Sequence, residues 1–426
     1  MSRRLIALLI LAVAVLTACG RATSTHPAAG GYRLFLEEGF SDGGQHITVR
    51  DSATGAIERE LPIGTAAADW SRYYSVASVG GSARLTAIDP ASGRTLNQTT
   101  IPAGYALPDL GYLGPTAGLS PNGQWLALTS QARSDGGAVI TNFMVGSSSL
   151  TQSFKTIHLN GDFAFDALSN DGQNLYLIQK MSDPNHYQVR LYQLGPAGGS
   201  LVTQPVVDKR EATEPMNGIR GDSAADPTGK SIYTVYVRDK NAPFIHALPL
   251  DQPFAWCLDL PAKAPSGIEE QFLWSLAITP NGRTLYAANP VLGSVAAITA
   301  GEPPVITRTG QVAFNRPGNL LAGLVTDAEA KGPRIGGVAL SADGQTLFAV
   351  GDGSVLAIDT ASLKVRSKIL DGHSVDSIRL SADGKWLYAV GASDSQIWQL
   401  DPATGAIHGE IKGIHNPWGL LWVAPR

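Results

Sequence analysis

The chain has 426 residues and a formal net charge of −4, from 32 basic and 36 acidic side chains. This near-neutral charge argues against a nucleic-acid partner, which would require a basic stripe. The 47 glycines and 26 prolines favour short strands separated by turns over long helices. A chain of this length can bury a large core, as one repeat domain or as two to three ordinary domains.

The N-terminal segment has the features of a targeting sequence. Arg3 and Arg4 precede an apolar run at 5–16, which is too short to span a bilayer comfortably and has the order of a signal peptide. No segment after residue 20 is apolar for 18 residues, so we expect no second membrane span.

The apolar run ends in the sequence LTACG at 16–20, which resembles the lipobox of bacterial lipoproteins. The resemblance implies that Cys19 is lipidated and that residues 1–18 are removed as a signal peptide. Residues 19–31 have no apolar period, so we expect a flexible tether that holds the chain at the extracytoplasmic face of the cell membrane. The alternative is an ordinary secretory signal with a chance cysteine.

One pattern recurs along the rest of the chain: a polar turn with a glycine, then an apolar strand. The six copies are SPNGQWLAL at 120, SNDGQNLYL at 169, DPTGKSIYT at 226, TPNGRTLYA at 279, SADGQTLFA at 341 and SADGKWLYA at 381. Successive glycines of these turns lie 40 to 62 residues apart. A period of this length with several strands per unit is typical of a β-propeller, and Asn-Gly and Asp-Gly suit tight hairpins.

A second motif follows the first in the repeated units. It appears as DSATG at 51, DPASG at 89, DTASL at 359 and DPATG at 401, each time between two strands. One unit therefore reads as a four-stranded antiparallel blade. The two motifs resemble the YVTN-type, WD40-like β-propeller repeat of bacteria over residues 32–426, and this resemblance implies a single all-β propeller domain. Propellers host many unrelated functions, so the resemblance implies no activity.

Counting the second strand of each unit gives eight blades, with seven as the alternative because this repeat family favours seven. The first unit lacks an inner strand, whereas the C-terminal sequence PWGLLWVAP at 417–425 aligns with inner strands, Gly419 matching Gly337. We therefore predict that the N- and C-terminal strands pair and close the ring. Residues 314–333 form an insertion on the rim of the channel, and the spacing of their apolar residues predicts a short helix.

The loops that lead into the inner strands align on this same rim, and their polar and aromatic side chains are candidates for ligand binding. These residues are Arg220, Asp222, Trp274, Arg334, His373, Asp376, His415 and Trp418. Guanidinium, imidazole, carboxylate and indole groups around a channel would suit a polar ligand or a peptide carboxylate. The alternative is an ordinary hydrated rim with tryptophans packed between the blades.

Metal and thiol chemistry find little support in the sequence. His373 and His415 align in adjacent blades, but no third metal ligand is evident, so we expect no metal site and no cofactor. Cys257 lies in an apolar, strand-like run and is expected to be a buried, inert thiol.

Three functions fit these features. The sequence contains no HExxH, CxxC, GxSxG or Walker motif, which favours a non-enzymatic, membrane-tethered scaffold that is monomeric and binds an envelope protein, a peptide or another ligand. The alternative is a lactonase-like hydrolase at the channel mouth, where the candidate carboxylates are Asp376, Asp222, Glu269 and Glu270. An accessory subunit of an envelope complex is the third possibility.

Overall fold

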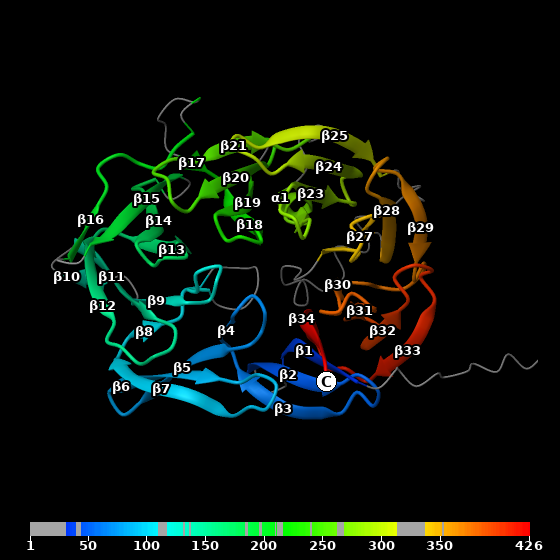
Figure 1. Cartoon of the computed structure of the whole chain (residues 1–426), viewed down its shortest axis with the longest axis horizontal. Coiled ribbons are helices and arrows are strands. Elements are labelled where there is room, and N and C mark those ends of the chain that lie inside the picture. Colours follow the sequence, from blue (N-terminus) through cyan, green and yellow to red (C-terminus); the bar gives the residue numbers. More distant parts are fainter. Residues whose placement is uncertain are drawn as a thin grey trace, which may run out of the picture.

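The chain forms eight antiparallel sheets that follow one another around a ring in this computed structural model (Figure 1). The structure describes residues 31–39, 44–109, 117–130, 133–135, 138–183, 186–195, 198–208, 210, 216–238, 241–261, 268–312, 337–351 and 353–426. We number the sheets as blades 1 to 8 in chain order. The fold is an all-β, eight-bladed propeller, which confirms the predicted architecture and the higher of the two blade counts.

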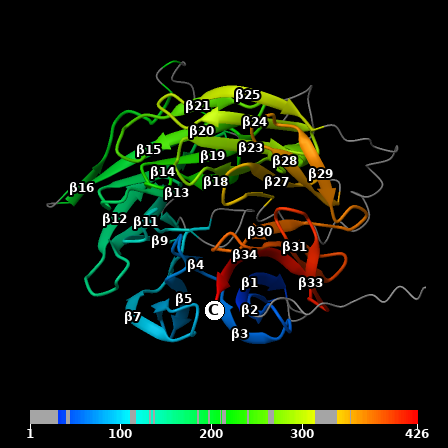
Figure 2. The same cartoon turned by 45° about the vertical axis from the view of Figure 1, so that its right-hand side comes forward.

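Each blade is built around four strands that lie side by side in order from the centre of the ring to its periphery, as β34, β1, β2 and β3 do in Figure 2. Blade 1 comprises β34 (Pro417–Pro425), β1 (Tyr32–Gly39), β2 (Gln45–Asp51) and β3 (Ile57–Pro62), and blade 2 comprises β4 (Thr65–Ala66), β5 (Tyr73–Val79), β6 (Ser82–Ile88) and β7 (Thr95–Pro102). Blade 3 comprises β8 (Tyr105–Ala106), β9 (Trp125–Ser130), β11 (Ala138–Ser147) and β12 (Lys155–Asn160), with the additional strand β10 (Arg133–Asp135). Blade 4 comprises β13 (Phe163–Leu168), β14 (Asn174–Lys180), β15 (His186–Gly195) and β16 (Gly198–Leu201), with the additional strand β17 (Met216–Asn217).

The remaining four blades follow the same plan. Blade 5 comprises β18 (Ile219–Ala225), β19 (Ser231–Val237), β20 (Phe244–Pro249) and β21 (Trp256–Asp259), and blade 6 comprises β22 (Ser275–Ile278), β23 (Thr284–Asn289), β24 (Ser294–Thr299) and β25 (Val305–Gln311). Blade 7 comprises β26 (Val338–Leu340), β27 (Thr346–Gly351), β28 (Ser354–Asp359) and β29 (Val365–Ile369), and blade 8 comprises β30 (Ser377–Leu380), β31 (Leu387–Gly391), β32 (Gln396–Leu400) and β33 (Ile407–Lys412). A short helix, α1 (Ile268–Gln271), precedes β22.

The turn between the first two strands of a blade is held by its own side chains. In blade 8, the Ser381 hydroxyl donates to Asp383 Oδ1 at 2.6 Å and accepts the backbone N–H of Trp386 at 2.9 Å. Asp383 Oδ1 also accepts the N–H of Lys385, while Gly384 has a φ of +70° that suits glycine. Equivalent serine or threonine bonds recur at Ser120, Ser169, Thr279 and Ser341. The recurring acidic and amide residues are therefore turn formers, as predicted.

The hydrophobic core is divided among the junctions between blades. Eight clusters of buried side chains lie in the described part of the chain, and each combines residues from two neighbouring blades. The aromatic residues of the second strands fill these junctions, and Tyr176, Phe348 and Tyr388 are fully buried. Because burial of apolar area is the main favourable term in folding, each blade depends on both of its neighbours.

The ring closes through blade 1. Strand β34 pairs antiparallel with β1, so that Leu34 lies opposite Val423 and Leu36 lies opposite Leu420. All four of these side chains are fully buried. This pairing confirms the predicted closure by the N- and C-terminal strands.

Three predicted segments lie outside the described residues. They are the signal peptide at 1–18, the tether up to residue 30, and the rim insertion at 314–333 with its expected helix. None of the helices in the described segments is both long enough and apolar enough to cross a bilayer.

A buried carboxylate lies in the closing blade. Glu37 on β1 is 7% exposed, and its Oε2 has no hydrogen-bond partner among the described residues. Burial raises the pKa of Glu37 above its usual range. Because the folded state favours the protonated form, this residue costs stability progressively as the pH rises through its folded pKa.

We therefore expect Glu37→Gln to increase the free energy of unfolding at pH 7 by about 1 kcal/mol, the lower end of the cost of an unsatisfied buried polar group. The gain should disappear near pH 4, where Glu37 is protonated in the folded protein. Urea unfolding across this pH range measures the effect, with the exposed Glu60→Gln of the same blade as control. A gain that is independent of pH would contradict this explanation.

Candidate functional site

Charged side chains gather on the innermost strands, where the sequence pattern is otherwise small and apolar. Arg220 on β18 donates from Nη1 to Asp166 Oδ1 on β13 at 2.7 Å, and from Nη2 to Ser223 Oγ at 3.2 Å. The side chains of Arg220 and Asp166 are only 16% and 4% exposed. The pair links blades 4 and 5, and removing either partner would leave the other charge buried without compensation.

Asp222, two residues further along β18, links blade 5 to blade 6. Its carboxylate accepts the backbone N–H of Leu276 on β22 and that of Ser223, both at 2.8 Å. Burial raises the pKa of Asp222, while these two hydrogen bonds and the positive charges of Arg379 and Arg220 oppose that rise. In blade 8 the hydroxyl of Ser377 has the corresponding role, accepting the N–H of Leu420 from blade 1 at 3.3 Å.

Arg379 on β30 is the second cation near the centre of the ring. Blades 5 and 8 are not neighbours, yet the charges of Arg379 and Asp222 act on each other, which indicates that the two side chains extend toward the same central region. The Nε of Arg379 donates to the carbonyl oxygen of Leu420 at 3.2 Å. Burial lowers the pKa of Arg379, and the ion pairs found among the described residues do not include it. Its guanidinium is therefore partly buried, without a contact ion pair among the described residues.

Two of the predicted rim residues serve the local structure of blade 8. Asp376 accepts the N–H of Ala392 on Oδ2 at 2.8 Å, which ties its loop to the neighbouring one. His373 is exposed, with Nδ1 at 3.4 Å from Asp394 Oδ2 and its ring at 5.0 Å from that of Trp398. The His373 side chain is therefore accessible to solvent, whereas one carboxylate oxygen of Asp376 already accepts a backbone N–H.

The other predicted rim residues have different environments. Trp274 is 1% exposed and packs in the hydrophobic cluster between blades 5 and 6, so it belongs to the core and does not face the rim. His415 is exposed, and Trp418 is 37% exposed. Arg334 lies outside the described residues.

Sequence reasoning missed Asp166 and Arg379. A usable signal was present, because Arg379 occupies the position that Ala277 and Ala339 hold in the inner strands of blades 6 and 7. A charge in such a position faces the centre of the ring or a neighbouring blade, and it requires a partner or a function.

The one cysteine among the described residues lies on the outermost strand of blade 5. Cys257 on β21 is half-buried, with Sγ at 4.0 Å from Nδ1 of His246. His246 is 2% exposed, and burial lowers its pKa. Among the residues that the structure describes, no group of three His, Cys, Asp or Glu side chains could hold a metal ion together.

Sequence comparison supports the repeat type. The model of the WD domain, G-beta repeat, matches residues 364–399, which run from β29 to β32. With eight four-stranded blades, the chain is a WD40-like β-propeller. The comparison with curated proteins found no match.

Solved structures resemble this one in fold. Dihydro-heme d1 dehydrogenase NirN in complex with DHE is 13% identical with a TM-score of 0.54, over 94% of this chain and 76% of that one. Apo AztD from Citrobacter koseri is 11% identical with a TM-score of 0.55, over 93% and 98% of the chains. The periplasmic gluconolactonase PpgL of Pseudomonas aeruginosa is 18% identical with a TM-score of 0.42, over 83% and 98%. These likenesses concern the fold alone.

The buried pair between blades 4 and 5 should contribute much more than an exposed one. We expect Asp166→Ala to lower the free energy of unfolding by about 3 kcal/mol, because Arg220 would remain buried without its partner. The control is Asp162→Ala, which breaks an exposed 3.6 Å pair with Lys180 and should cost less than about 1 kcal/mol. Chemical denaturation compares the two variants, and equal losses would contradict the assignment.

Proposed function

We propose that this protein is a non-enzymatic binding scaffold that receives an acidic group of its ligand on Arg379, near the centre of the ring. The observation that carries the proposal is the state of that guanidinium. It is partly buried, it donates one hydrogen bond to the carbonyl oxygen of Leu420, and no described carboxylate forms a contact ion pair with it.

Burying a charged group costs free energy unless the charge is paired. A partly buried cation loses hydration, and a carboxylate in contact offsets that loss through charge-assisted hydrogen bonds. Asp222 acts on Arg379 electrostatically, but its oxygens already accept two backbone N–H groups. The planar fork of an arginine suits a carboxylate bidentately, so a peptide C-terminus is a fitting ligand.

The proposed location is the extracytoplasmic face of the cell membrane, with the propeller anchored through a lipid on Cys19. The LTACG sequence at 16–20 supports this placement. A tethered, monomeric propeller would present its rim, including the exposed His415 and Trp418, to a peptide or protein of the envelope. A lactonase-like activity is not proposed, because no observation on the described residues favours it.

We expect a tripeptide with a free C-terminal carboxylate to raise the melting temperature of the protein at millimolar concentration, because binding to the folded state alone stabilises it. The same tripeptide with an amidated C-terminus should have little effect. Arg379→Gln should abolish the response, whereas Arg379→Lys should retain part of it because the charge remains.

The exposed Arg283→Gln provides the control for a general loss of positive charge. Circular dichroism establishes that each variant is folded before its thermal response is compared. An equal response to the amidated peptide, or an unchanged response of Arg379→Gln, would reject the proposed role of Arg379.

The anchor is tested separately in a bacterial host. We expect the wild-type protein to partition into the detergent phase, with the mass of the purified chain showing a lipid on Cys19. Cys19→Ala should leave the chain unlipidated and in the aqueous phase. A wild-type chain with an unmodified Cys19 would exclude the anchor without affecting the proposed binding at Arg379.

A further inference from the structure

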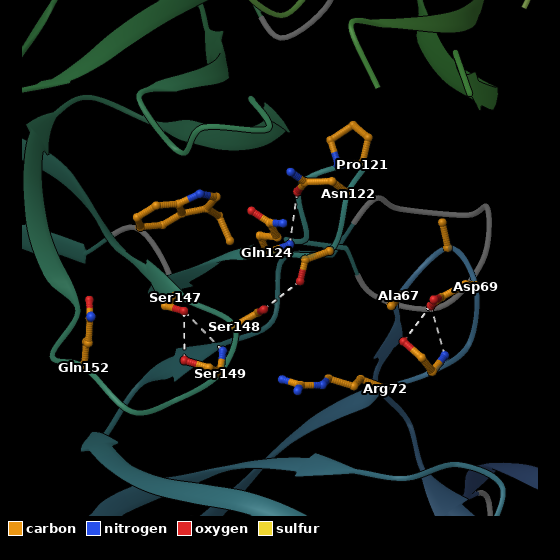
Figure 3. A pocket seen from close by; sticks show the side chains of 14 residues that line it. Ala67, Asp69, Arg72, Pro121, Asn122, Gln124, Ser147, Ser148, Ser149 and Gln152 are labelled. Carbon is orange, nitrogen blue, oxygen red and sulfur yellow. Dashed lines mark hydrogen bonds between the residues drawn. The ribbon is translucent and has the colours of Figure 1, made fainter. Parts of the chain in front are cut away.

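A cleft lies on the face of the ring that carries the turns between the first and second strands of the blades. This cleft has a volume of about 730 Å³ and lies between blades 2 and 3 (Figure 3). Three turns line it: 67–72 in blade 2, 121–125 at the start of β9, and 147–152 between β11 and β12. The lining is mostly hydroxyl, amide and charged groups, with the indole of Trp125.

The cleft exists because the turn of blade 2 departs from the repeat. This turn has the hydrogen bonds of the others, since the N–H of Ala67 donates to the carbonyl of Arg72 and Asp69 Oδ1 accepts the N–H of Ser71. Trp70 occupies the glycine position with a φ of +53°, and its ring stacks at 6.3 Å on Trp422 of blade 1. The indole therefore packs toward blade 1, away from blade 3.

The turns of blades 3, 4 and 5 are linked to each other by hydrogen bonds. The backbone N–H of Asn122 in blade 3 donates to Asn170 Oδ1 of blade 4 at 2.9 Å, and Asn170 donates to the carbonyl of Thr228 in blade 5 at 3.0 Å. Between the turns of blades 2 and 3, the hydrogen bonds found among the described residues include no such link. The two turns approach each other at Ala67 and Gly123, and the cleft opens beside this contact.

Arg72 occupies the position from which blades 3 and 4 contact the next blade. Its counterpart Trp125 packs on Gly172 of blade 4, where a Cβ would lie 2.3 Å from the indole, and the next counterpart, Asn174, donates to the carbonyl of Leu250 in blade 5. The Arg72 side chain instead extends into the cleft toward the serines of blade 3 (Figure 3). Its guanidinium makes none of the hydrogen bonds or ion pairs found among the described residues.

The wall opposite Arg72 offers a dense set of neutral polar groups. Ser147 and Ser149 share a hydroxyl–hydroxyl hydrogen bond of 2.9 Å, and Ser148 is fixed by a 2.6 Å bond to the carbonyl of Gly123. The side-chain amides of Gln124 and Gln152 line the cleft, and no hydrogen bond of the described residues uses them. The site thus combines one cation with many groups that both donate and accept.

We propose that this cleft binds a saccharide that carries a carboxylate, such as a uronic-acid oligomer. Arg72 would receive the carboxylate, for which its planar fork is suited. Sugar hydroxyls both donate and accept, as do the serines and glutamines of the opposite wall. The remaining carboxylate of the lining, Asp69, accepts from Ser71 in its own turn, which lowers its pKa and keeps it charged as a further acceptor for hydroxyl groups.

The composition of the cleft favours a saccharide over an apolar peptide. A peptide-binding groove would offer apolar pockets or an unpaired strand edge for alternate side chains. This cleft presents turns, and its exposed side chains are polar apart from Trp125 and a few small residues. The proposal is independent of the acidic-group site at Arg379, which lies on another part of the ring.

Isothermal titration calorimetry with trigalacturonate tests the proposal on the full propeller. We expect saturable one-to-one binding that weakens with added salt, because one ion pair is involved. The methyl ester of the same trisaccharide should bind at least about tenfold more weakly, as should Arg72→Gln with the free acid. Gln152→Ala should weaken binding of both sugars, because it removes a hydroxyl partner.

The matched control is Arg84→Gln, an exposed arginine of the same blade on β6, which should leave binding unchanged. Arg379→Gln should also leave it unchanged, so that failure of one proposed site is distinguishable from failure of the other. Absence of binding, equal binding of acid and ester, or full affinity in Arg72→Gln would each overturn the proposal. Competition by inorganic phosphate as effective as the trisaccharide would show an anion site without sugar recognition, which also overturns it.

Discussion

The pairing of β1 with β34 is the constraint on which the rest of the structure depends. Blade 1 obtains its innermost strand only from the C-terminal segment, and the cluster between blades 8 and 1 is built from Leu34, Leu420 and Val423 together with Tyr388. The N–H of Ala382 in blade 8 also donates to the carbonyl of Val423 at 2.9 Å. Without this strand, the inner edge of β1 would be unpaired, and the junction between blades 8 and 1 would lose the apolar side chains of β34.

In the closed ring, the candidate binding residues lie at positions where one blade differs from the others. Small or apolar residues on the inner strands allow eight blades to approach one axis, so each exception stands out. Arg379 stands where blades 6 and 7 have an alanine, and Asp222 stands where blade 8 has Ser377, which likewise accepts an N–H of the next blade. On the turn face, Trp70 replaces the glycine of the repeat and Arg72 replaces a residue that would contact the next blade. The repeats therefore supply the scaffold, and departures from them supply the candidate binding groups.

The sequence predicted the features that depend on local chemistry. The Ser-x-Asp-Gly turns report hairpins directly because their side chains bond to their own backbone, and the alignment of 417–425 with inner strands predicted the closure. Non-local features were missed. Asp166 and Arg220 are separated by 54 residues and meet only through the packing of blades 4 and 5. Trp274 was assigned to the rim because it precedes an inner strand, but its side chain packs in the cluster between blades 5 and 6. The cleft could not be predicted from the sequence, because it depends on contacts that the turn of blade 2 does not make with its neighbour.

The most direct test of this account is a cross-link between the two terminal strands. Arg33 and Ala424 lie opposite each other in the β1–β34 pair and are half-buried, so cysteines at both positions should be within disulfide range. In a chain with Cys19 and Cys257 replaced by serine, the account predicts rapid and quantitative formation of a disulfide within one chain under mild oxidation. A chain that stays reduced, or that forms only disulfide-linked dimers, would contradict closure of the ring by its own ends.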